Sequence, residues 1–132
     1  MDRYLIYNLL HLIGVMGLFL SLGGMFAGAI QHKASSSITS VKSAFVWWRP
    51  SVIMHGISMF LILLGGFGML ARLGIAWPWP IWIFIKLFIW FVLGGILGAV
   101  ARNPSIGGVA WYASLLLGAL AAFLCTFKML FG

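Results

Sequence analysis

The chain has 132 residues, 64% of them hydrophobic and only 7% charged, and its mean hydropathy is +1.15. Soluble domains carry about a quarter charged residues, so the composition excludes an ordinary soluble domain and predicts one integral membrane domain over residues 1–132. The formal charge of +7 comes from eight basic residues against one acid, Asp2. The bases stand singly at the ends of apolar runs, which does not fit a nucleic-acid-binding face.

Four apolar stretches are long enough to cross a bilayer as helices, at about 4–30, 51–72, 81–101 and 109–131. We therefore expect an all-α fold, a bundle of four transmembrane helices. Both termini and residues 73–80 then share one side of the membrane, here called the terminal side. The opposite side, with residues 31–50 and 102–108, is called the loop side.

Basic residues set the expected orientation. The loop side carries Lys33, Lys42, Arg49 and Arg102, and the terminal side carries Arg3, Arg72 and Lys128. The positive-inside rule therefore predicts that the first and third loops are cytoplasmic. We expect an integral protein of a bacterial cytoplasmic (inner) membrane.

The first loop contains an amphipathic segment at about 38–48. Its apolar residues Ile38, Val41, Phe45 and Trp48 recur at helical spacing and form one face. This pattern predicts an interfacial helix that lies on the membrane.

Small residues form stripes on two of the expected spans. Such stripes allow close helix contact, either within the bundle or with other membrane subunits. The stripe of the first span comprises Gly17, Ser21, Gly24 and Gly28, and that of the third span comprises Gly94 and Gly98.

The missing residue types exclude much chemistry. No acid lies within a span, which excludes carboxylate-pair catalysis, a triad with an acid, and oxygen cages for Mg²⁺ or Ca²⁺. The single cysteine, Cys125, excludes a disulfide within the chain. The remaining candidates are one lysine and three histidines, Lys86, His11, His32 and His55.

Depth in the membrane separates these candidates. At 1.5 Å per residue, Lys86 and His11 lie about 9 and 10 Å from the terminal side, so they share a level if their helices are neighbours. His55 lies about 6 Å from the loop side and His32 lies at that surface. A haem held by His11 and His55 together is therefore disfavoured. Core packing for His55 and an interfacial position for His32 are the alternatives to ligand binding.

Each leading candidate also has a structural interpretation. Lys86 either extends its stem so that the ammonium reaches the terminal-side headgroups, or faces the bundle and needs an anionic ligand, another subunit, carbonyl groups or deprotonation. His11 is either an axial haem ligand or a histidine hydrogen-bonded to a neighbouring helix. The seven methionines admit copper(I) ligation, but their scatter favours apolar packing.

Two stretches resemble a known family. The run "YLIYNLLHLIGVMGLFLSLGGMFAGAIQH" resembles the first helix, and "WIFIKLFIWFVLGG" the third helix, of small four-helix membrane proteins that include the HemJ-type protoporphyrinogen oxidases. CopD-like and SirB-like proteins are similar. The resemblance implies haem b, a functional histidine at His11 and a functional lysine at Lys86, and it places His32 at a later histidine of the first helix.

The leading functional hypothesis is therefore haem b or another tetrapyrrole bound through His11. Lys86 would hold a propionate or a proton, as a catalytic residue if the protein is an enzyme, which the sequence leaves open. The alternative is a non-catalytic accessory subunit of a larger membrane complex, joined through faces that carry Gly17, Gly24, Gly28, Gly94 and Gly98. A third is copper or small-solute transport, for which the spans offer no pathway of polar residues.

Overall fold

The computed structural model describes residues 2–34 and 48–127, and over these ranges it is helical without strands. The helices are α1 (Arg3–Ala34), α3 (Trp48–Arg72), α4 (Ile81–Arg102), the short 3₁₀ helix η1 (Pro104–Ile106) and α5 (Gly107–Thr126). Four of them are long and apolar enough to cross a membrane. The expected all-α fold with four candidate spans is confirmed at this level. The expected interfacial helix lies outside the described residues, except for Trp48, which is the first residue of α3.

Local sequence explains where α3 ends and α4 begins. Gly74 adopts a left-handed φ of 67°, and its N–H donates to the Ala71 carbonyl, while the Ile75 N–H donates to that of Leu70. This pair of hydrogen bonds is a Schellman motif, which satisfies the last carbonyls of a helix and turns the chain away. Pro80 then precedes the first residue of α4. A short connection of this kind makes α3 and α4 run in opposite directions.

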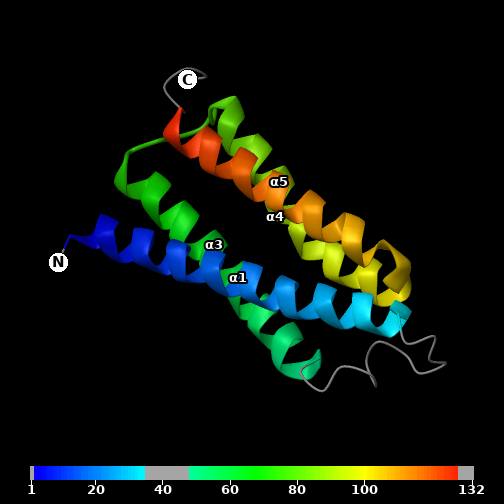
Figure 1. Cartoon of the computed structure of the whole chain (residues 1–132). Helices are drawn as coiled ribbons and strands as arrows, with labels where there is room; N and C mark the ends of the chain where they lie inside the picture. The colour runs from blue at the N-terminus through cyan, green and yellow to red at the C-terminus, as the bar shows by residue number, and fades with distance from the viewer. Residues whose placement is uncertain (1, 35–47, 128–132) are drawn as a thin grey trace.

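The helices form two pairs, α1 with α3 and α4 with α5 (Figure 1). At the loop side the pairs meet, because Gly107 at the start of α5 lies against Ala29 and Ile30 of α1. At the terminal side the first residues of α1 and the last residues of α5 lie apart (Figure 1). The two pairs therefore splay toward the terminal side.

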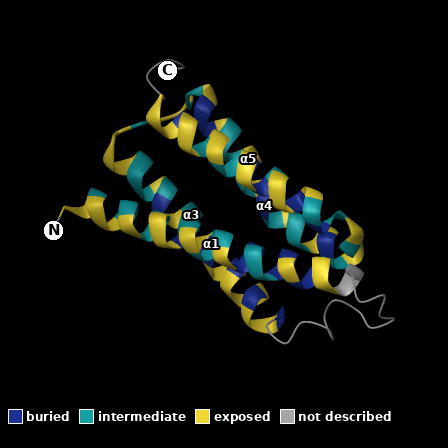
Figure 2. Ribbon diagram, viewed as in Figure 1, coloured by how far each residue is buried: buried dark blue, intermediate teal, exposed yellow. Residues whose placement is uncertain are grey.

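The hydrophobic core follows this geometry. Residues 3–13 of α1 include no buried residue, whereas the second half of the helix is rich in them (Figure 2). The buried apolar residues of α1 are Leu18, Leu22, Met25, Phe26 and Ala29, and those of α4 and α5 include Ile89, Leu93, Val100 and Ala110. Packing around α1 is thus densest toward the loop side, whereas the buried residues nearer the terminal side, Trp82, Ile83 and Leu124, belong to α4 and α5.

Glycine makes the close approach of α1 and α3 possible. A Cβ added at Gly14 would come within 2.9 Å of Ile62 and of the Ser58 carbonyl, and one added at Gly17 would collide with the Ser58 hydroxyl. From the other side, a Cβ at Gly65 would lie 2.7 Å from the His11 backbone nitrogen. The expected contact at Gly17 is thus made within the chain. Gly65 also lies at this contact, although it belongs to neither of the small-residue stripes predicted from the sequence.

The glycines of the α4 stripe make fewer close contacts than those of α1. A Cβ at Gly94 would meet only the Met59 methyl group, at 2.8 Å, and a Cβ at Gly98 would meet no atom within 4 Å. Gly98 is also exposed. The α4 pattern is therefore not a helix-contact motif among the described residues of this chain.

A pair of alanine substitutions in α3 tests the glycine contact. We expect Gly65→Ala to destabilise the protein by about 1–3 kcal/mol, because the new methyl group forces α1 and α3 apart. Gly56→Ala is the matched control: Gly56 lies in the same helix, and a Cβ there meets open space. It should be neutral or stabilising by up to about 1 kcal/mol, since alanine is the better helix former. Thermal unfolding in detergent measures both, and equal midpoints would contradict the packing argument.

Candidate functional site

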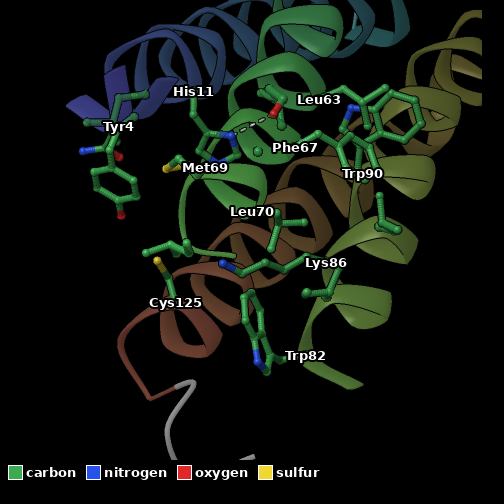
Figure 3. Close-up of a pocket in the computed structure, with 17 residues that line it drawn as sticks. Tyr4, His11, Leu63, Phe67, Met69, Leu70, Trp82, Lys86, Trp90 and Cys125 are labelled. Carbon is green, nitrogen blue, oxygen red and sulfur yellow. Dashed lines mark hydrogen bonds between the residues drawn. The ribbon is translucent and has the colours of Figure 1, made fainter. Parts of the chain in front are cut away.

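A cavity of about 220 Å³ lies between the two splayed helix pairs (Figure 3). All four α-helices contribute to its wall, and most of the lining is apolar or aromatic. The lining side chains with polar or sulfur atoms are Tyr4, Asn8, His11, Met69, Trp82, Lys86, Trp90 and Cys125. The structure thus brings His11 and Lys86 to one cavity, in agreement with the level expected for them.

Close packing of α1 on α3 fixes the ring of His11. Its Nδ1 lies 2.8 Å from the carbonyl oxygen of Ile62. A carbonyl oxygen only accepts, so Nδ1 carries the hydrogen and donates, and Nε2 keeps the lone pair. A Cβ added at Gly66 would only touch the ring, 3.7 Å from Nδ1, whereas one at Gly65 would lie 2.7 Å from the His11 Cβ. Gly65 therefore allows His11 to approach α3, a role that the helix-contact pattern alone does not predict.

Lys86 lies on the opposite side of the cavity, on α4. Its ammonium lies 5.3 Å from the centroid of the Trp82 ring, one turn earlier on the same helix. This is a cation–π geometry, which stabilises a cation by about 0.5–2 kcal/mol. In Figure 3 the side chain extends between Leu70 and Trp82 toward Cys125. Lys86 is close enough to His11 to interact with it electrostatically.

The charge of Lys86 has no counter-ion in the described part of the cavity wall. No acid lines the cavity. Asp2, the one acid of the chain, accepts a hydrogen bond from the Tyr4 backbone N–H at 3.2 Å, at the exposed start of α1. A cation in an apolar cavity is electrostatically complementary to an anionic group.

Several lining residues were not among the sequence candidates. Tyr4 and Asn8 lie one turn apart and two turns or less before His11, so the three share one face of α1. The spacing of four and three residues between them is helical, so their shared face could have been predicted from the sequence. Met69 and Cys125 gave no such signal, because only the tertiary arrangement places α3 and α5 at one cavity.

The other two histidines lie away from this cavity. His55 on α3 is 6% exposed, and its side chain faces α4 near the backbone of Gly94. Neither of its ring nitrogens has a well-aligned hydrogen-bond partner in the described structure. His32 falls in the last residues of α1, and its side chain lies outside the described part. Within residues 2–34 and 48–127, no three His, Cys, Asp or Glu side chains gather in a way that would hold a metal ion.

Comparison with protein-family models, curated protein sequences and solved structures finds no match to this chain.

The hydrogen bond of His11 predicts a defined tautomer. We expect the neutral ring of His11 to carry its hydrogen on Nδ1, since of the two neutral tautomers only that one donates to the Ile62 carbonyl. Nitrogen-15 NMR of histidine-labelled protein distinguishes the two ring nitrogens, and the signals missing in His11→Gln assign them. Detection of the Nε2–H tautomer at His11 would contradict the geometry. His55→Gln serves as the control that leaves the His11 signals in place.

Proposed function

We propose that this chain is a membrane-embedded tetrapyrrole-binding protein, with haem b as the ligand, that serves redox or porphyrin chemistry. The observation that carries the proposal is the pairing, at one apolar cavity, of an imidazole that has a free Nε2 with a lysine that has no acid. The likeness of two helices to those of HemJ-type proteins supports the same assignment.

The residues of the cavity fit such a group. Histidines that ligate metals almost always donate their other ring nitrogen to a carbonyl, carboxylate or water, as His11 does to Ile62. Lys86 offers a cation for a propionate, and apolar side chains such as Leu87 and Trp90 offer walls for a flat ring. When bound, haem would supply one-electron chemistry, while the protein sets the axial ligand and the surroundings.

Replacing Lys86 tests what its charge costs the protein when no ligand is bound. We expect Lys86→Met to leave the stability of the ligand-free protein unchanged or to raise it by about 1 kcal/mol. The lost cation–π contact contributes about 0.5–2 kcal/mol, but a lysine in a membrane span costs up to about 2.5–3.5 kcal/mol at the centre. Lys86→Arg keeps the charge and should show no gain. Unfolding midpoints in detergent measure both, and a marked destabilisation by Lys86→Met would instead show that Lys86 is neutralised within the empty chain.

A haem titration of the purified protein tests the function. We expect a Soret band that grows to one haem per chain and is lost in His11→Ala, because the axial ligand is removed. His55→Ala, the matched control, should keep the band, since His55 does not line the cavity. Lys86→Met should weaken binding about tenfold, the loss of one charge-assisted contact. A band that survives His11→Ala, or a protein that stays colourless, would overturn the proposal.

One observation favours the second candidate, an accessory subunit. The face of α4 with Gly95 and Gly98 is exposed, and a Cβ at either position meets no atom within 4 Å. Another transmembrane helix would approach closely there. Gly98→Leu should then release a co-purifying membrane subunit without changing the haem titration. Isolation of a stable single chain, with the same yield for Gly98→Leu, counts against this role.

A further inference from the structure

Aromatic side chains bridge α3 and α4 beside the cavity. Four aromatic side chains from residues 67–84 pack there in a chain of contacts. The ring centroids of Phe67 and Trp79 lie 5.5 Å apart, those of Trp79 and Phe84 6.1 Å, and those of Trp77 and Phe84 6.0 Å. Such contacts stabilise by about 0.5–1.5 kcal/mol each beyond the area that they bury. This cluster obstructs the path of a ligand between α3 and α4.

The opposite side, between α1 and α5, is open at the level of the cavity. Leu12 on α1 lines the cavity and is nevertheless 51% exposed, and Cys125 on α5 also lines it and is exposed. The contacts that join α1 to α5 lie nearer the loop side. There Phe19 packs where a Cβ of Gly118 would stand, and Ala29 lies against Gly107. Toward the terminal side the two helices diverge (Figure 1).

Position along α1 shows what this opening faces. Leu12 is nine residues after Arg3, so it lies about 14 Å along a helix that is expected to cross the membrane. At that depth the neighbouring medium is hydrocarbon rather than water. An opening at Leu12 therefore leads into the bilayer, whereas Tyr4 lies at the terminal-side interface.

The volume of the cavity also favours an opening toward the bilayer. Small-molecule sites usually measure about 300–1,000 Å³, more than the 220 Å³ of this cavity. A tetrapyrrole seated against His11 must therefore extend beyond the cavity wall. The α1–α5 side, where Leu12 and Cys125 line the cavity and are exposed, is one direction in which the described structure leaves space. An apolar ring edge there would rest on lipid at little cost in free energy.

We propose that the cavity opens laterally into the bilayer between α1 and α5, and that its ligand is a membrane-dissolved amphipathic carboxylate that enters through this opening. The carboxylate goes to Lys86, on the terminal-side part of α4, and the apolar body follows between the helices. The identity of the ligand as a tetrapyrrole rests on the proposed function, whereas the opening itself does not. Leu12 and Cys125 form its rim.

Spin labels test the opening without any ligand. In a Cys125→Ala chain, nitroxides attached at Leu12→Cys and, as a control, at Ile13→Cys are compared in phosphatidylcholine vesicles. Ile13 is as exposed as Leu12, at 49%, but does not line the cavity. We expect both labels to be more accessible to oxygen, which dissolves in lipid, than to a water-soluble nickel chelate. Preferential access of the nickel chelate to the Leu12 label alone would overturn the proposal in favour of a water-filled entrance.

Protoporphyrin IX, which is diamagnetic, then tests the route. It should immobilise the label at Leu12→Cys and leave that at Ile13→Cys unchanged. In otherwise unaltered chains, Leu12→Trp should slow uptake of protoporphyrin IX from vesicles about tenfold, and Ile13→Trp should not. Equal uptake by both tryptophan variants would overturn the route. A failed haem titration together with lipid-facing labels at Leu12 would overturn the proposed function and leave the lateral opening standing, so the two failures are distinguishable.

Discussion

The close approach of α1 to α3 is the constraint on which the rest of the structure depends. Gly14 and Gly17 on one helix and Gly65 on the other remove the side chains that would hold them apart. Backbone and side chain then come near enough for His11 to donate to a carbonyl of the neighbouring helix. A hydrogen bond to a carbonyl that already belongs to a helix uses its second lone pair and leaves the helix intact. The orientation of the imidazole is therefore a property of backbone packing, and a substitution at a contact glycine can disturb it.

Much of the fold could be predicted from the sequence, because hydropathy and helix length reflect the solvent rather than the tertiary structure. The four spans needed only long apolar runs, and the common level of His11 and Lys86 needed only the rise per residue. What the sequence could not predict was which helices pair. The stripe of α4 looks like that of α1. However, a Cβ added at Gly98 would meet no atom of the described chain, while one added at Gly17 would meet Ser58. Periodicity identifies a face that can be approached, but it does not name the approaching helix.

The same limit applies to the site. Lys86 stood out as a lone charge in a sequence whose one acid is Asp2, but its contact with Trp82 follows from rotamer choice, and its place in one cavity with His11 follows from how the two helix pairs meet. Met69 and Cys125 belong to helices that the sequence does not connect. His55 shows the reverse case. Its burial agrees with the core-packing interpretation, yet among the described residues its ring nitrogens lack the well-aligned partners that a buried histidine usually has.

The splay of the two helix pairs has a consequence for how this protein responds to occupancy. Toward the terminal side α1 diverges from α5 and residues 3–13 include no buried residue, so the terminal-side half of α1 is the part in which local opening costs least free energy. A ligand that contacts His11 on one pair and Lys86 on the other would connect the two pairs. Its binding free energy would then add directly to the stability of that half. The empty and occupied proteins should thus differ less in shape than in resistance to proteolysis, and cellular abundance would follow the supply of the ligand.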